Sequence, residues 1–226
     1  MERSKCLFLY EEIMLLALRN DKGTVAAGFV EYAVAGAVLA ELLLDGRISV
    51  GDTKKKLVDL KTADPVGDPV IDECLERMGA AKRRASLNTW VSRLAGIKGL
   101  RHKVAQQLCD RGILRAEEGS VLFIFTRKTY PELNPEPEMK IVERLRSAIF
   151  CEGDRLDPRT VVLISLAHSN NLLSENLGRK EIRSQKKRIE RIVNGELIGK
   201  ATKEVIEACQ AAVMVAVIVP TIMASS

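Results

Sequence analysis

Aromatic residues are scarce in this chain: Phe, Trp and Tyr together make up 4% of its 226 residues. Leu, Ala, Val, Ile, Glu, Arg and Lys dominate instead, and 46% of the residues are hydrophobic, which is enough for a sizeable core. Because these dominant residues are mostly good helix formers, the composition disfavours a sheet protein. We expect a mostly α fold built from packed amphipathic helices.

Metal-binding motifs are also missing from the sequence. It contains two histidines, His102 and His168, and neither lies at helical spacing from a second plausible ligand. The five cysteines include no C-x-x-C pair, so they indicate reduced thiols and not zinc ligands or a disulfide framework. We therefore expect no metal centre and no cofactor.

Catalytic signatures are absent as well: the sequence has no glycine-rich phosphate loop, nucleophile elbow or kinase motif. Glu11 and Glu12 are adjacent near the start of a predicted helix, where acids are favoured and neighbours point to different faces, so a structural role fits them better than catalysis. His168, on an apolar helix, is interpreted as a hydrogen-bonded core residue, and Trp90 as a packing anchor. We expect no catalytic residues and no enzyme.

The sequence has no apolar run that is long enough to span a bilayer. The nearest candidate, residues 208–219, falls short of the ~20 apolar residues required and ends before Pro220, so it is interpreted as a buried final helix. Met1 leads almost directly into a helical pattern and not into a cleavable signal. The expected location is cytoplasmic.

Hydrophobic periodicity predicts helices separated by turns that contain glycine or proline. The helix at 29–44 is apolar nearly all round and is expected at the centre of a helical bundle. Residues 47–50 and 57–60 are expected to form a short hairpin. Because the proline-rich connector at 130–138 is short, we expect a single domain spanning residues 1–226. The other predicted helices cover residues 9–18, 70–78, 87–94, 101–110, 139–150, 157–173, 179–193 and 202–219.

The stretch from Ile97 to Phe125 joins positive charge to apolar sequence. Lys98 and Arg101 are three residues apart and are predicted to share a helix face. Turn signals then flank an apolar run that is predicted to be a hairpin strand, consisting of Val121, Leu122, Phe123, Ile124 and Phe125. Alone, each half is typical of a solvated turn or a core strand, but together they suggest contact with a phosphate-bearing membrane surface.

A second hypothesis is a winged-helix nucleic-acid-binding protein. The formal charge is +5 with a pI near 9.0, and residues 179–191 form the densest basic segment. A helix, a glycine turn and a two-stranded wing occur at 33–60 and again at 101–125, as in winged DNA readers. The first copy offers almost no polar side chains for base edges, whereas the second offers several, so nucleic acid is the less favoured partner.

With these elements in place, the chain resembles the Golgi phosphoprotein 3 family over nearly its whole length. The order and spacing of several short segments together carry the resemblance. These segments are residues 8–18 with Asp21-Lys22-Gly23, Glu41-Leu42, Gly46-Arg47-Ile48, Gly67-Asp68, Asp72-Glu73, Asn88-Thr89-Trp90-Val91, residues 101–114 and Leu166-Ala167-His168-Ser169-Asn170.

The resemblance implies a helical single domain with a protruding apolar hairpin at about residues 119–130, acting without catalysis as a peripheral membrane adaptor. Family members bind phosphatidylinositol 4-phosphate in a shallow basic pocket and insert the hairpin into the bilayer. In eukaryotes they hold glycosyltransferase tails for retrograde coat vesicles, and in some members the hairpin serves oligomerisation. We therefore expect an anionic phospholipid surface as partner, a homo-oligomer through the hairpin, and the Golgi face as location if the source is eukaryotic.

Carried over residue by residue, the head-group ligands fall on Lys98 and Arg101. Helpers are expected among Arg19, Lys22, Phe29 and His102, and membrane insertion or oligomerisation among Val121, Leu122, Phe123, Ile124 and Phe125. The family's tryptophan before the central helix has no counterpart, and its arginine within that helix falls near Ala35. Because one charge-assisted hydrogen bond contributes roughly 1.5 to 3 kcal/mol, affinity for this lipid is expected to fall at least about tenfold, or the preferred lipid to differ.

The long polar N-terminal tail of eukaryotic members is not part of this sequence. We therefore expect a bacterial or otherwise divergent member of the family.

Overall fold

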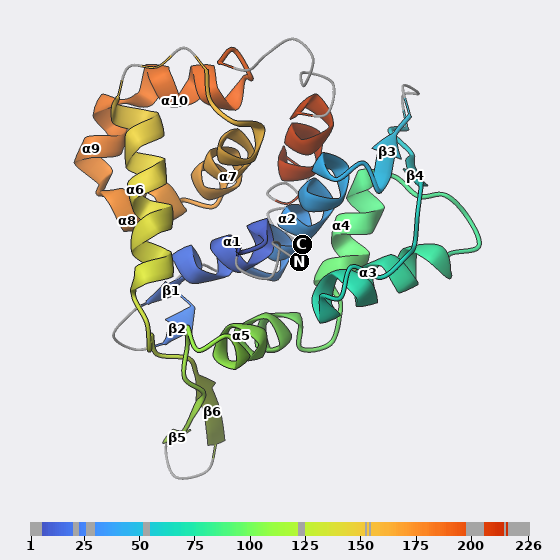
Figure 1. Cartoon of the computed structure of the whole chain (residues 1–226), viewed down its shortest axis with the longest axis horizontal. Helices are drawn as coiled ribbons and strands as arrows, with labels where there is room; N and C mark the ends of the chain where they lie inside the picture. Colours follow the sequence, from blue (N-terminus) through green and yellow to red (C-terminus); the bar gives the residue numbers. More distant parts are fainter. Residues whose placement is uncertain are drawn as a thin grey trace.

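Helices make up most of the structure, as the composition predicts (Figure 1). The computed structural model describes residues 6–19, 23–25, 30–51, 55–121, 125–151, 153, 155–197, 206–214 and 216. Its named helices are α1 (Leu9–Ala17), α2 (Val30–Leu44), α3 (Pro69–Gly79), α4 (Leu87–Ala95), α5 (Leu100–Asp110), α6 (Glu136–Phe150), α7 (Pro158–Ser169), α8 (Leu172–Leu177), α9 (Arg179–Ser184) and α10 (Lys186–Val193). Residues 206–214 are also helical.

The central helix of the bundle is α2, as its apolar sequence predicts. It contacts α1, α4, α5 and α7, and every residue from Ala33 to Leu43 is buried. Gly36 matters here because a Cβ at this position would meet the Cβ of Ala216 at 3.0 Å, so glycine lets the C-terminal segment pack closely against α2. Buried side chains from α1 through to this C-terminal segment form one hydrophobic cluster.

Three two-stranded antiparallel sheets complete the described structure. The predicted hairpin is confirmed by β3 (Ile48–Val50) and β4 (Val58–Leu60), where Ser49 pairs with Asp59. The pairing of β1 (Leu18–Arg19) with β2 (Thr24–Val25) was not predicted, since strands of two residues carry no periodicity.

Two predicted long helices are each divided. The predicted helix at 157–173 ends as α7 at Ser169 and resumes as α8, because Asn171 adopts a left-handed backbone with φ of 61°. The predicted helix at 179–193 is interrupted at Gln185, which separates α9 from α10. A break at one residue leaves the apolar periodicity on both sides intact, so the pattern did not reveal it.

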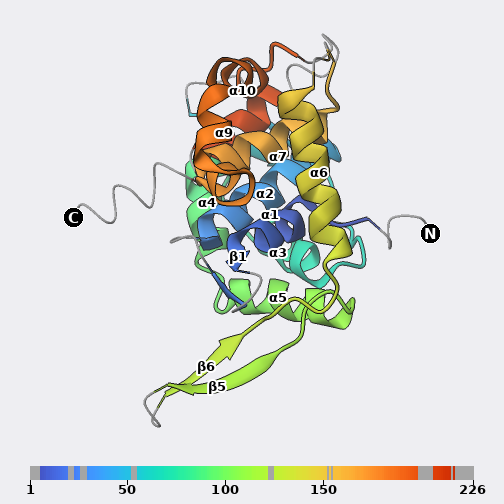
Figure 2. The same cartoon turned by 90° about the vertical axis from the view of Figure 1, so that its left-hand side faces the viewer.

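The hairpin formed by β5 (Glu117–Val121) and β6 (Phe125–Thr129) projects from the end of the bundle beside α5 (Figure 2). Val121 pairs with Phe125, so the apolar run extends across the connection between the two strands. The prediction that this run forms one strand is therefore wrong. The other four pairs of the ladder join residues 117–120 to residues 126–129, which are mostly polar, and Leu122, Phe123 and Ile124 lie outside the described residues.

Candidate functional site

The predicted head-group residues lie at the start of α5, at the end of the bundle that carries the hairpin (Figure 1). Lys98 lies in the turn between α4 and α5, and Arg101 in the first turn of α5. Their predicted common helix face is wrong, because glycines at 96 and 99 interrupt the helical run and Gly99 has φ of 71°. The turn nevertheless keeps both cations beside the same helix terminus.

The N-terminus of α5 is open to an anion. Gly99 provides no side-chain cap, and the first turn contains no acidic residue, so the N–H groups and the helix dipole favour negative charge there. Lys98 is exposed and forms no ion pair with any described residue. Lys103, in contrast, is paired with Glu73 of α3. Lys98 and Arg101 are thus two cations beside this terminus.

An acidic side chain lies close to Arg101. The Nε of Arg101 lies 3.9 Å from Oε1 of Glu31, in the first turn of α2. Ala35, one turn further along α2, is fully buried. The family resemblance implies an arginine near position 35 that holds the head group, but in this chain Ala35 is a core residue. The arginine that is present, Arg101, has the carboxylate of Glu31 close to it.

His102 connects Arg101 to the base of the hairpin. Its Nε2 lies 3.4 Å from Nη2 of Arg101, and its Nδ1 lies 2.9 Å from the hydroxyl of Tyr130, which follows β6. Because arginine only donates, Nε2 accepts and Nδ1 carries the proton that it donates to Tyr130. Burial, reinforced by Arg101, lowers the pKa of His102, which favours this neutral ring.

The other three expected helpers are not placed by the structure. Lys22 and Phe29 lie outside the described residues, as does the side chain of Arg19.

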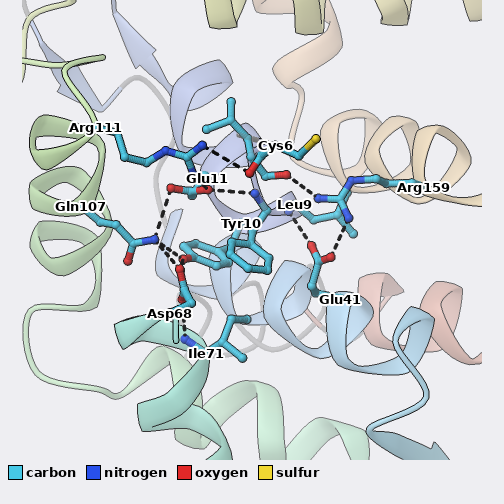
Figure 3. Close-up of polar contacts among 12 residues, drawn as sticks. Cys6, Leu9, Tyr10, Glu11, Glu41, Asp68, Ile71, Gln107, Arg111 and Arg159 are labelled. Carbon is cyan, nitrogen blue, oxygen red and sulfur yellow. Dashed lines mark hydrogen bonds and ion pairs between the residues drawn. The ribbon is translucent and has the colours of Figure 1, made fainter. Parts of the chain in front are cut away.

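A second polar cluster is buried around the N-terminus of α1 (Figure 3). The hydroxyl of Tyr10 donates to the carboxylate of Asp68, with both oxygens at 2.7 Å, and accepts from Nε2 of Gln107 at 2.7 Å. Asp68 also caps α3 by accepting from the N–H of Ile71 at 2.8 Å. Burial raises the pKa of Tyr10 far above its usual range, so its hydroxyl remains a donor. This cluster ties α1 to α3 and α5.

Two of the acids near α1 are paired with arginines of neighbouring elements. Glu11, which is completely buried, lies 2.7 Å from Nη1 of Arg111, just after α5. Glu12 lies 2.9 Å from Nη2 of Arg144 on α6. Burial raises the pKa of both carboxyls, and the arginines oppose that rise. These contacts support the structural role expected for the two glutamates.

Glu41 of α2 completes this arrangement. Its Oε1 lies 2.6 Å from Nη1 of Arg159 on α7, and its Oε2 accepts from the N–H of Leu9 at 2.7 Å (Figure 3). Sequence reasoning missed this cluster because its partners are far apart in the chain, by 118 residues for Glu41 and Arg159. The available signal was the presence of glutamates within otherwise apolar helices, since a buried acid requires a partner.

Comparison with known proteins identifies the family of this chain. The sequence matches the profile of the Golgi phosphoprotein 3 (GPP34) family over residues 9–209. The chain belongs to this family. The matched range includes the buried cluster around α1, the start of α5 and the β5–β6 hairpin.

One curated relative is vacuolar protein sorting-associated protein 74 of Eremothecium gossypii. It is 26% identical to this chain over 209 residues, an alignment that covers 77% of this chain and 62% of the relative. The chain therefore spans less than two thirds of the length of the curated relative that it matches.

Two further interpretations from the sequence have different outcomes in the structure. Trp90 is buried, with Arg93 stacked 5.0 Å from its ring centre, which confirms it as a packing anchor. His168 is exposed in the last turn of α7, so its interpretation as a core residue is wrong. The buried face of α7 ends at Ala167, and the helix ends two residues later.

Within the described residues, no helix is long and apolar enough to cross a membrane.

Proposed function

We propose that this protein is a non-enzymatic peripheral membrane adaptor that binds anionic phospholipid at the start of α5 and with the β5–β6 hairpin. Its family membership favours phosphatidylinositol 4-phosphate as the lipid. The observation that carries the proposal is the contact between His102 and Tyr130, which joins the basic helix terminus to the hairpin base at 2.9 Å. The two features therefore lie at the same end of the bundle (Figure 2).

The chemistry of this end suits a phosphate ester close to a bilayer. The open N–H groups of α5 offer hydrogen bonds to phosphate oxygens, and the forked guanidinium of Arg101 offers a planar pair of donors. Lys98 adds a mobile ammonium group from the preceding turn. Basic groups beside an anionic membrane each contribute about 1 kcal/mol of attraction, and we propose that the apolar residues 121–125 add burial in the lipid.

Affinity is expected to be weaker than in a site with a full set of cations. Glu31 partly neutralises Arg101 and also repels a phosphate, while Ala35 offers no charge. We therefore propose that the site recognises phosphate monoesters on a membrane with limited head-group discrimination.

The proposed setting follows from the family. We propose that the 226 residues act as one domain, which the single hydrophobic cluster from α1 to the C-terminal segment supports. A Golgi-associated location is proposed for a eukaryotic cell.

Vesicle co-sedimentation tests the lipid site. Phosphatidylcholine vesicles would carry phosphatidylinositol 4-phosphate, phosphatidylinositol or phosphatidylserine in turn. We expect Lys98→Ala with Arg101→Ala to weaken binding to the phosphorylated lipid at least about tenfold, since two charge-assisted contacts are lost. A matched control removes two exposed cations elsewhere, Lys82 and Arg83. Equal binding by the site variant and the wild type would show that the lipid binds elsewhere.

The hairpin has its own test, Phe123→Asp. Insertion predicts a large loss of vesicle binding with an unchanged oligomeric state in sedimentation-velocity runs. A variant that becomes monomeric while retaining membrane affinity would instead make the hairpin an oligomer interface and remove it from the lipid site.

The winged-helix alternative has less support in this arrangement. It relied on the wing after α5 together with the basic segment 179–191, but the hairpin and the helices α9 and α10 lie at opposite ends of the bundle (Figures 1 and 2). A mobility-shift assay with duplex DNA at low salt tests it directly.

A further inference from the structure

We propose that the outward faces of α9 and α10 form a docking surface for an acidic polypeptide segment. The buried side chains of Ile182, Ile189 and Ile192 anchor the two helices to the bundle, which fixes the face that they present to solvent. We call that face the basic ridge, defined by the exposed cations Arg179, Lys180, Arg183, Lys186 and Lys187.

The segment that carries the basic ridge, residues 179–191, accounts for the whole charge excess of the chain. Residues 179–191 include seven basic and two acidic residues, a net charge of +5, which equals the formal charge of the complete sequence. The rest of the chain therefore has 28 basic and 28 acidic residues. Arg179 and Arg183 are four residues apart on α9, where like charges repel each other. A bound anion would relieve this repulsion.

The two carboxylates within residues 179–191 leave most of the basic ridge unpaired. Glu181 pairs with Arg146 of α6 at 2.7 Å, and Glu190 lies 3.8 Å from Nζ of Lys186. Among the described residues, Lys186 is thus the ridge cation with a carboxylate partner, and the other four ridge cations have none. These four form no ion pair with any described residue: Arg179, Lys180, Arg183 and Lys187.

The surroundings favour a polypeptide over a nucleic acid or a bilayer. Neither α9 nor α10 contains an aromatic residue, so the ridge lacks the stacking platform on which single-stranded bases are held. The large apolar side chains that are exposed in the described structure, Leu133, Met139 and Met214, lie on other segments, so the ridge has no group to insert into lipid. The ridge also lies at the end opposite the hairpin (Figures 1 and 2), and so faces away from a membrane that the hairpin contacts.

Fluorescence anisotropy with a labelled peptide of alternating Glu and Gly tests this proposal on the full chain. We expect binding that weakens as salt rises, because exposed charges are screened. The ridge variant replaces the four unpaired cations with alanine, a good helix former, and should weaken binding at least about tenfold. The control variant removes four exposed cations elsewhere and should bind as the wild type does: Lys55, Lys61, Lys82 and Arg83. Circular dichroism checks that both variants fold, and the charge reversal Arg183→Glu provides a second, single-site test.

Further measurements separate the acidic-polypeptide proposal from its competitors. No peptide binding at low salt, or equal losses in the ridge and control variants, would overturn it. Tighter binding of single-stranded RNA than of the peptide, lost in the ridge variant, would assign the surface to nucleic acid and also overturn it. Retention of the labelled peptide on vesicles coated with wild-type protein would support it, and this arm alone rests on the proposed membrane function. Vesicle binding by the protein without peptide binding would contradict the proposal that the ridge docks an acidic polypeptide, while leaving the proposed lipid site intact.

Discussion

Glu31 should restrain anion binding at the start of α5, so Glu31→Gln should strengthen vesicle binding. Its carboxylate lies 3.9 Å from Nε of Arg101, with 34% and 41% of the two side chains exposed. At that separation and with solvent access, a charge pair contributes about 0.5 to 1 kcal/mol. Neutralising Glu31 frees Arg101 for phosphate and removes a repulsion, so affinity should rise about two- to fivefold at physiological salt.

The assay is co-sedimentation with vesicles that contain phosphatidylinositol 4-phosphate, with Glu190→Gln on α10 as the control for net charge. The control lies at the far end of the bundle and should change affinity little (Figure 1). Glu31 also lies in the first turn of α2, where an acid stabilises the helix by about 0.3 to 1 kcal/mol, so a small loss of stability should accompany the gain in binding. Unchanged or weaker binding by Glu31→Gln, with the protein folded, would refute this reasoning.

Three further predictions concern folding stability, measured by urea unfolding. Tyr10→Phe removes a buried hydroxyl and leaves Asp68 without that donor, so the free energy of unfolding should fall by about 1 to 3 kcal/mol. Arg111→Met leaves Glu11 buried without its ion-pair partner and should lower the free energy of unfolding by about 3 kcal/mol. The double variant that also carries Glu11→Gln should recover part of this loss. His102 has a lowered pKa in the folded state, so below about pH 6.5 the unfolded chain takes up its proton first and stability falls, and His102→Gln should reduce that pH dependence.

Most helices were predictable because their patterns are local. The prediction of a helix over 29–44 agrees with α2 to one residue, since sixteen nearly continuous apolar positions admit few other interpretations. The division at Asn171 was not predictable, because it depends on the sign of one backbone angle. The prediction that Lys98 shares a helix face with Arg101 is wrong because the spacing of the two cations carries no information about the glycines at 96 and 99, which place Lys98 in a turn.

The identities of the site residues could be proposed from the family resemblance, but their partners could not. Glu31, His102 and Tyr130 meet through folding of distant segments, and periodicity carries no information about such contacts. The buried cluster of Tyr10 and Asp68 has the same origin, with 58 residues between its partners. What the resemblance could not supply is therefore the electrostatic balance around Arg101.

A backbone amide NMR titration with short-chain, water-soluble phosphatidylinositol 4-phosphate tests the central claim most directly. If phosphate binds at the start of α5, the amides of Gly99, Arg101 and His102 should shift with a single saturable dissociation constant, while those of α10 should not respond. The same shifts should disappear in the Lys98→Ala, Arg101→Ala variant. Saturable shifts confined to another part of the protein, with the start of α5 unaffected, would contradict it.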